Sequence, residues 1–225
     1  MLKIDKVSAS IAGNTVLRGI TTEFNAGQLL AVVGRNGAGK TTLLRAIMGL
    51  LPLSSGSISI SGTDLTGVPG HRRTGYGIGY APEDRVMFPT FSVEENLRLP
   101  CEVMGLPESE IRRRLDRVLE VVPQLEPMLA RSGAALSGGQ GKMAALGRAL
   151  MAGTQLVLLD EPFQGLAPVL ANQYAESLRK LHQLDPSLCI VVTESNRSLL
   201  RDLPDATLTL ERGELVVEAP QAAAH

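Results

Sequence analysis

A glycine-rich segment that ends in lysine and threonine is the strongest chemical feature of the sequence. It consists of Gly34-Arg35-Asn36-Gly37-Ala38-Gly39-Lys40-Thr41 and matches the pattern G-x-x-x-x-G-K-[ST] in full. In such a loop the glycines let successive backbone N–H groups turn toward phosphate oxygens, a conformation that most side chains prevent. Lys40 would add a positive charge at the β- and γ-phosphates, and Thr41 would offer a hydroxyl to Mg²⁺. The segment predicts a loop that binds a triphosphate.

Two consecutive acidic residues follow an apolar run about 120 residues later. Asp160 and Glu161 come directly after residues 155–159, which read as a buried strand. A carboxylate at the end of such a strand lies at the edge of the sheet where Mg²⁺ and its waters can be held. Glu161 is then placed to polarise a water that attacks the γ-phosphate. The pair is a weak signal alone, but together with the phosphate-binding loop it predicts triphosphate hydrolysis.

A second possible anion site precedes another helix. Its residues are Ser137, Gly138, Gly139 and Gln140, and the N-terminus of the following helix would add a partial positive charge. Ser137 alone is equally explained as an ordinary helix cap. The two glycines are not, because each costs about 1 kcal/mol relative to Ala within a helix. Two separate anion sites in one chain indicate that two copies share nucleotide at their interface.

The elements that must position these residues alternate between strand and helix. Apolar runs at residues 28–33, 155–159 and 188–193 predict buried strands, and residues 168–184 predict a helix. Strand patterns precede the loop and recur at residues 57–61 and 76–81, and residues 206–218 show a hairpin signal. Hydrophobic residues make up 44% of the chain and aromatic residues 3%, so the core must be aliphatic. An aliphatic, glycine-rich chain favours a parallel sheet covered by helices.

The stretch from about residue 88 to residue 150 has a mainly helical pattern. Ser92 and Glu95 match a capping box, and Ile111, Leu115 and Val118 recur at helical spacing. The arginines at 112–114 and 117 predict a solvated helix face rather than a phosphate contact. We therefore expect one α/β domain over residues 1–218, with a core of 1–87 and 151–218, a helical subdomain at 88–150, and a disordered tail at 219–225.

Composition excludes several classes of protein. Lys and Arg number 22 against 23 Asp and Glu, so the chain lacks the basic excess of a general nucleic-acid binder. Two distant cysteines fit neither a disulfide scaffold nor a zinc site, and Cys189 is expected to be a plain buried thiol. No apolar run approaches the ~20 residues that span a bilayer, and the N-terminus lacks the apolar core of a signal peptide. These features predict a cytosolic protein.

The order of these motifs resembles the nucleotide-binding subunits of ABC transporters, over residues 2 to about 217. The resemblance implies a P-loop NTPase fold of the ABC type, with a mainly parallel core sheet, an N-terminal antiparallel β portion and a helical insertion. It implies a head-to-tail dimer in which Ser137, Gly138, Gly139 and Gln140 contact the partner's ATP. It further implies that residues 34–42, including Thr42, bind the triphosphate, that Thr41 and Asp160 serve Mg²⁺, and that Glu161 is the catalytic base. Residues 165–167 would connect the two sites.

Some positions depart from the common pattern of that family. Glu83 stands where most members have a Gln that contacts Mg²⁺ and water, and Glu194 where most have a switch His. Ile11 stands where an aromatic residue usually stacks on adenine, which predicts weak discrimination between ATP and GTP. A glutamate near neutral pH cannot donate a hydrogen bond to phosphate as His does, so Glu194 either acts through water or a nearby donor or simply caps the next helix.

Residues 81–97 and 160–168 are similar to those of branched-chain amino acid importer ATPases, a pattern shared with urea and amide importers. This implies an ATPase subunit at the cytoplasmic face of the membrane, working with separate permease subunits and a solute-binding protein. The dimer is either a homodimer or a heterodimer with a second ATPase. Two rival readings are a soluble ABC ATPase that acts on nucleic acid or ribosomes, and a weakly active regulatory module.

Overall fold

Two sheets form the framework of the molecule. The computed structural model describes residues 1–84, 87–200 and 202–216. The first sheet has four antiparallel strands in the order β2 (Asn14–Phe24), β1 (Leu2–Ile11), β4 (Ser55–Ile60), β5 (Thr63–Asp64). The second has six strands in the order β10 (Glu214–Val216), β9 (Ala206–Glu211), β3 (Leu29–Val33), β8 (Cys189–Glu194), β7 (Leu156–Asp160), β6 (Ile78–Ala81). All its neighbouring strands run parallel except β9 and β10.

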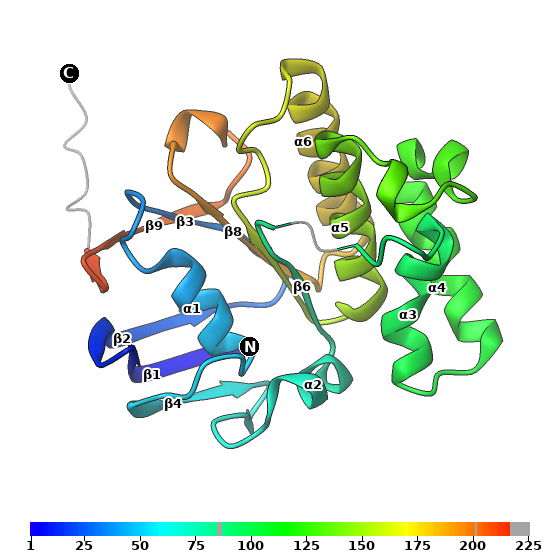
Figure 1. Cartoon of the computed structure of the whole chain (residues 1–225). Coiled ribbons are helices and arrows are strands. Elements are labelled where there is room, and N and C mark those ends of the chain that lie inside the picture. Colours follow the sequence, from blue (N-terminus) through cyan, green and yellow to red (C-terminus); the bar gives the residue numbers. More distant parts are fainter. Residues whose placement is uncertain (85–86, 201, 217–225) are drawn as a thin grey trace.

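The helices lie on both faces of the six-stranded sheet (Figure 1). Helix α1 (Lys40–Ile47) lies between the two sheets, and its buried side chains pack with residues of β1, β3 and β7. The opposite face packs against α5 (Gly138–Ala152) and α6 (Pro168–Leu184), and α3 (Val93–Val103) and α4 (Glu108–Val121) pack in turn on α5. Strands β3, β7 and β8 are buried along their whole length because both faces are covered. The predicted α/β fold, with its parallel core sheet, antiparallel N-terminal portion and helical insertion, is confirmed.

Local sequence signals account for several helix ends. Ser92 accepts a hydrogen bond from the Glu95 N–H at 3.1 Å, and the Glu95 carboxylate accepts one from the Ser92 N–H at 2.7 Å. This is the predicted capping box at the start of α3. Helix α6 has the predicted bounds, with a proline in its first turn. The predicted disordered tail at 219–225 lies outside the described residues.

The arginine-rich face of α4 is less solvated than predicted. Arg114 donates a hydrogen bond to the Met151 carbonyl at 2.8 Å, and Arg117 forms an ion pair with Asp185. Both acceptors lie at the C-terminal ends of helices, α5 and α6, where a cation is favourable. These two side chains therefore join the helices rather than extend into solvent.

An unexpected buried cation fixes the C-terminal end of α1. Arg73 ends the short helix α2 (Gly70–Arg73) and is 2% exposed. Its guanidinium donates to four backbone carbonyls, those of Leu65, Ala46, Val68 and Ile47, at 2.5 to 3.1 Å. Two of these carbonyls belong to the last turn of α1, whose partial negative charge favours a cation. Arg73 thus binds the helix that follows the phosphate-binding loop to the neighbouring segment.

Four 3₁₀ helices complete the described elements: η1 (Thr74–Tyr76), η2 (Pro123–Met128), η3 (Gly133–Ala135) and η4 (Arg197–Leu199). No helix in the described part of the chain has the length and apolar character needed to cross a membrane. Cys101 and Cys189 are both buried, and burial raises the pKa of the Cys189 thiol to about 12, as expected of a plain core thiol.

Candidate functional site

The residues predicted to bind and hydrolyse the triphosphate lie together at one edge of the six-stranded sheet. Val33 pairs with Glu194 across β3 and β8, and Asp160 pairs with Thr193 across β7 and β8. Since these strands are parallel, their C-terminal ends and the loops that follow them lie side by side. The order of strands in the sheet therefore explains how positions 34, 160 and 194 come to be neighbours.

The phosphate-binding loop joins β3 to α1 with two glycines in the left-handed region. Gly37 has φ of 81° and Gly39 has φ of 110°. Gly39 comes directly before Lys40, the first residue of α1, so the loop ends on the positive end of a helix. The hairpin of β9 and β10 supports the loop from outside, because the Gly213 N–H donates to the Ala38 carbonyl at 2.9 Å. A Cβ on Gly213 would lie 1.9 Å from the Val16 carbonyl oxygen, so only glycine fits there.

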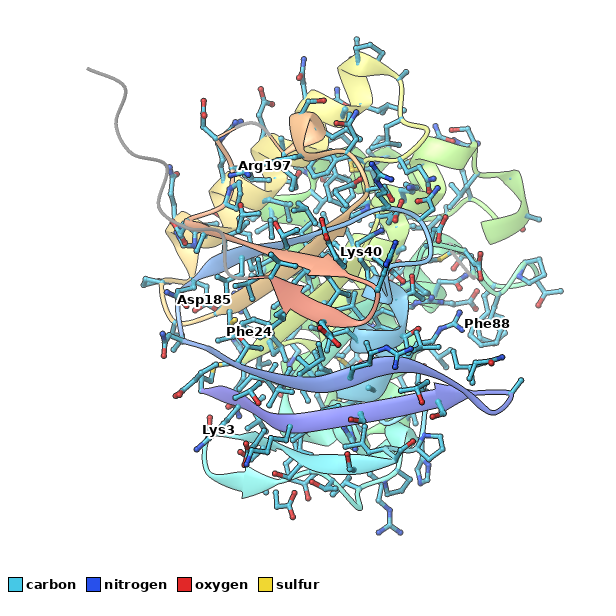
Figure 2. The ribbon with its side chains drawn as sticks, turned by 90° about the vertical axis from the view of Figure 1, so that its left-hand side faces the viewer. Lys3, Phe24, Lys40, Phe88, Asp185 and Arg197 are labelled. Atoms are coloured by element: carbon cyan, nitrogen blue, oxygen red, sulfur yellow. The ribbon has the colours of Figure 1, made fainter. Side chains whose placement is uncertain are left out.

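Lys40 is buried within this loop and surrounded by oxygen atoms. Its ammonium group donates to the Gly34 carbonyl at 2.8 Å, the Arg35 carbonyl at 3.2 Å and the Ser195 hydroxyl at 3.0 Å. It also forms an ion pair with Glu161 Oε1 at 3.0 Å. In Figure 2, Lys40 lies at the start of α1 beside the ends of the core strands. One positive charge thus lies between the phosphate-binding loop and the acidic end of β7.

Asp160 is 2% exposed and its carboxylate is fully engaged. Thr193 donates to its Oδ1 at 2.7 Å, Thr41 approaches the same oxygen at 3.2 Å, and the Tyr80 hydroxyl donates to Oδ2 at 3.3 Å. Burial, together with the nearby Asp160 charge, raises the pKa of Tyr80, so the phenol keeps its proton and remains a donor. These three hydroxyls fix the orientation of the carboxylate toward Thr41.

The donor set around Asp160 fits Mg²⁺. Thr41 and Asp160 supply hard oxygen ligands within 3.2 Å of each other, next to a loop suited to phosphate. Within the described residues no cluster of three or more His, Cys, Asp or Glu could hold a metal by itself. That agrees with Mg²⁺ rather than contradicting it, because Mg²⁺ usually takes one or two protein ligands together with water and substrate phosphates.

Glu161 has an unusual backbone and one unpaired carboxylate oxygen. Its φ is 44°, in the left-handed region that non-glycine residues rarely adopt, and its side chain is nearly buried. Oε1 lies 3.0 Å from Lys40 Nζ and 2.6 Å from Ser195 Oγ. Oε2 is buried without a hydrogen-bond partner among the described residues. A buried carboxylate oxygen without a donor is available to accept a proton from a bound water.

A cavity of about 400 Å³ opens above these residues. Its walls combine loop residues with the acidic side chains and the strand β2, and they comprise Val16, Asn36, Gly37, Gly39, Lys40, Thr41, Thr42, Glu83, Glu161 and Gln164. Glu83, predicted as a contact for Mg²⁺ and water, is exposed but faces this cavity. The structure therefore brings together the loop, Glu83, Asp160 and Glu161.

Comparison with known proteins agrees with this geometry. A family model described as ABC transporter matches residues 17–164, more than half of the chain. The chain belongs to the ABC transporter family. It is 34% identical to the branched-chain amino acid transport ATP-binding protein BraG of Pseudomonas aeruginosa, over 99% of this chain and 94% of that protein. It is 32% identical to the probable branched-chain amino acid transport ATP-binding protein LivF of Archaeoglobus fulgidus, over 96% and 90%.

A solved ATP-binding subunit of an ABC transporter has the same fold. It superimposes with a TM-score of 0.83 at 28% identity, covering 96% of this chain and 88% of that structure. Other matched relatives are named for different solutes, among them sn-glycerol-3-phosphate. Membership of the family establishes that this chain is an ATP-binding protein and an ATPase.

The turn after β8 of this ABC ATPase differs from the sequence-based expectation. Glu194, predicted at the switch position, is 1% exposed, and its Oε1 accepts the Phe163 N–H at 2.8 Å. Burial, with a smaller effect of the Glu161 charge, raises the pKa of Glu194 to about 7. The side chain of this turn that reaches Lys40 and Glu161 is that of Ser195. Alternation of side chains along the strand explains the difference, because adjacent residues face opposite sides.

The Ser137 segment of the ABC ATPase does not line the cavity above its own loop. Ser137 accepts the Gln140 N–H at 3.3 Å, and Gln140 Oε1 accepts the Ser137 N–H at 3.0 Å, so the segment is a capping box. A Cβ on Gly139 would lie 2.3 Å from a methyl carbon of Leu170, which gives this glycine a packing role that the sequence did not reveal. Gly138 begins α5 beside it.

Ile11 is also separate from the cavity. It lies at the end of β1 opposite Asn14 and is 44% exposed. Of the residues near the start of the chain, Val16 is the one that lines the cavity. Neither is aromatic, so the described residues of the cavity offer no ring on which a base could stack.

Proposed function

We propose that this chain is the ATP-hydrolysing subunit of an importer, and that the importer carries branched-chain or other amino acids. The observation that carries the hydrolytic part is the set of contacts made by Lys40 and Glu161 at the mouth of the loop. The transport part is supported by similarity over nearly the full chain to two ATP-binding proteins named for branched-chain amino acid transport. Amino acids are favoured over other solutes because the chain covers 94% and 90% of those two relatives, but only 58% of the relative named for sn-glycerol-3-phosphate.

Each group of residues in the site would have a separate role in hydrolysis. Backbone N–H groups of the loop and the Lys40 ammonium would bind the β- and γ-phosphates. Thr41 and Asp160, with Glu83 nearby, would hold Mg²⁺, which when bound neutralises charge on the phosphates. Glu161 would accept the proton of the attacking water on its unpaired Oε2. Ser195 would keep the Glu161 carboxylate turned toward Lys40 through its contact with Oε1.

A second copy of an ABC ATPase would complete the site. The Ser137 segment lies outside its own cavity and exposes the N-terminal end of α5, which suits a phosphate on another molecule. We infer a head-to-tail dimer, either of two copies of this chain or with a second ATPase. Separate permease subunits would form the channel, and a solute-binding protein would deliver the solute. The subunit would therefore sit at the cytoplasmic face of the membrane.

Light scattering and ATP hydrolysis assays on Glu161→Gln, with wild type as the control, test the dimer and the role of Glu161 as the base. Wild type should hydrolyse Mg-ATP, while the variant should bind it with only a small residual turnover and double in mass when Mg-ATP is added. Hydrolysis by the variant at the wild-type rate would refute Glu161 as the base. A mass that stays monomeric while ATP is bound would replace the homodimer with a heterodimer, and an absence of turnover in wild type would favour a regulatory module.

A further inference from the structure

The short turn that carries Glu161 is held at both ends by buried side chains. The turn comprises residues 161–163, directly after β7, and its first residue has the strained φ of 44°. Such a conformation costs on the order of 1–3 kcal/mol and persists only where the surroundings hold it. The residues that hold it therefore decide where the Glu161 carboxylate points.

Lys142 holds the first end of the turn. It lies on α5 and is 8% exposed, and its ammonium group donates to the Glu161 carbonyl at 2.6 Å. A lysine at such depth is rare unless its charge is accommodated by oxygen atoms. Because the bond is to the carbonyl of Glu161 itself, it restrains the rotation of that peptide, and with it the left-handed backbone.

Glu194 holds the other end from the opposite direction. It lies at the end of β8, is 1% exposed, and accepts the Phe163 N–H at 2.8 Å. The Phe163 ring packs edge-on against Tyr174 of α6, with ring centres 5.3 Å apart. The Glu161 N–H is held in addition by the carbonyl and the hydroxyl of Thr193, both at 3.1 Å. Both ends of the turn are therefore hydrogen-bonded to core elements, the first end to α5 and β8 and the last end to β8.

We propose that Lys142 and Glu194 are positioning residues, which hold the backbone of residues 161–163 so that the Glu161 carboxylate faces the nucleotide cavity. Neither side chain lines that cavity, so both act through the turn and not on substrate. The proposal rests on the proposed role of Glu161 as the base. It also explains why Lys142 and Glu194 are buried although neither takes part directly in hydrolysis.

The test uses substitutions that keep size and remove a hydrogen bond. Lys142→Met removes the donor to Glu161, and Lys180→Met is its matched control, since Lys180 also donates to a backbone carbonyl, that of Glu120 at 2.7 Å, on the surface of α6. Glu194→Leu removes the acceptor for Phe163, whereas Glu194→Gln keeps an oxygen in its place. For each full-length protein, kcat for Mg-ATP hydrolysis, the Kd for Mg-ATP and the melting temperature are measured.

We expect Lys142→Met and Glu194→Leu to lower kcat at least tenfold while the Kd for Mg-ATP stays within about threefold of wild type. Glu194→Gln should retain at least fivefold more activity than Glu194→Leu, and Lys180→Met should match wild type. Wild-type kcat in Lys142→Met would overturn the proposal. So would a loss of kcat that is matched by an equal loss of nucleotide affinity, because a merely structural role predicts it.

A double substitution separates positioning from catalysis. If Lys142 acts by placing Glu161, then Lys142→Met should lower the residual rate of Glu161→Gln by less than twofold, since no base remains to be misplaced. An equal loss in both backgrounds would overturn the proposal. Should Lys142→Met fail to fold, the two Glu194 variants alone decide, and equal activities for them would refute it. Failure of Glu161 as the base would show separately, as turnover by Glu161→Gln at the wild-type rate.

Discussion

Replacing Arg73 by methionine should destabilise the protein strongly although Arg73 lies outside the nucleotide cavity. The guanidinium is 2% exposed and donates to four carbonyls. The carbonyls of Ala46 and Leu65 also accept backbone N–H groups, from Gly49 and Val68, so they keep one partner in the variant. The carbonyls of Ile47 and Val68 have no other donor in the described part of the chain.

The magnitude follows from these two carbonyls. A buried acceptor that loses its only donor costs about 1–3 kcal/mol, so two of them cost about 2–6 kcal/mol in the free energy of unfolding. Part of this is recovered because methionine needs no dehydration of a charge, which leaves a net loss of about 3 kcal/mol. For a chain of this length that corresponds to a melting temperature lower by about 6–12 °C. The melting temperature of Arg73→Lys should lie between those of wild type and Arg73→Met, because an ammonium group can reach only some of the carbonyls.

Thermal and urea unfolding of wild type, Arg73→Lys and Arg73→Met measure the effect. The difference should be the same at pH 6 and pH 8, because the guanidinium stays protonated and backbone carbonyls do not titrate. A melting temperature of Arg73→Met within 2 °C of wild type would refute the reasoning. A difference that changes with pH would show that a titrating group, and not the carbonyls, is the main partner.

Three further predictions concern the nucleotide site. Ser195→Ala should lower kcat by roughly 10- to 150-fold, because it removes a hydrogen bond to a carboxylate worth about 1.5–3 kcal/mol, and steady-state hydrolysis at unchanged rate would contradict this. Wild type should bind ATP and GTP with similar Kd, because no described residue that lines the cavity offers a ring on which adenine could stack, and a strong preference for ATP in nucleotide titrations would contradict this. Since burial raises the pKa of Glu194 to about 7 from its ordinary value of 4.5, the folded protein holds a proton between pH 4.5 and pH 7 that the unfolded chain has lost. Stability should therefore fall as pH rises from 4.5 to 7, by up to about 3 kcal/mol; urea unfolding of Glu194→Gln should lack this slope, and parallel pH profiles of the two proteins would exclude Glu194 as its source.

Local sequence was enough to predict the loop, the order of strands and helices, and one capping box. These features depend on residues close together in the chain, such as Ser92 with Glu95, or on the apolar runs that form β7 and β8. The site residues that the sequence missed depend on distant partners. Ser195 comes next to Lys40 only when β8 pairs with β3, and one residue of strand alternation separates it from Glu194.

The burial of Lys142 and Arg73 could not be predicted from the sequence either. Lys142 lies in a helix whose other buried side chains are apolar, and its acceptor is a carbonyl 19 residues away. The four carbonyls around Arg73 come from two segments that fold against each other. A backbone carbonyl leaves no mark in the sequence, so a buried cation that donates to carbonyls looks like an ordinary surface residue until the fold is known.

The contact between Gly213 and Ala38 has a consequence for how the protein is made. The phosphate-binding loop is synthesised early, yet its outer support is the hairpin at the end of the described chain, and β3 pairs on both sides with strands from the last third. A growing chain still on the ribosome therefore lacks β8, β9 and Gly213 until residues 189–213 have been synthesised. Because domains generally fold as units during synthesis, nascent chains halted before about residue 190 should not retain nucleotide. The ATP site would then form only after β8, β9 and Gly213 have been synthesised.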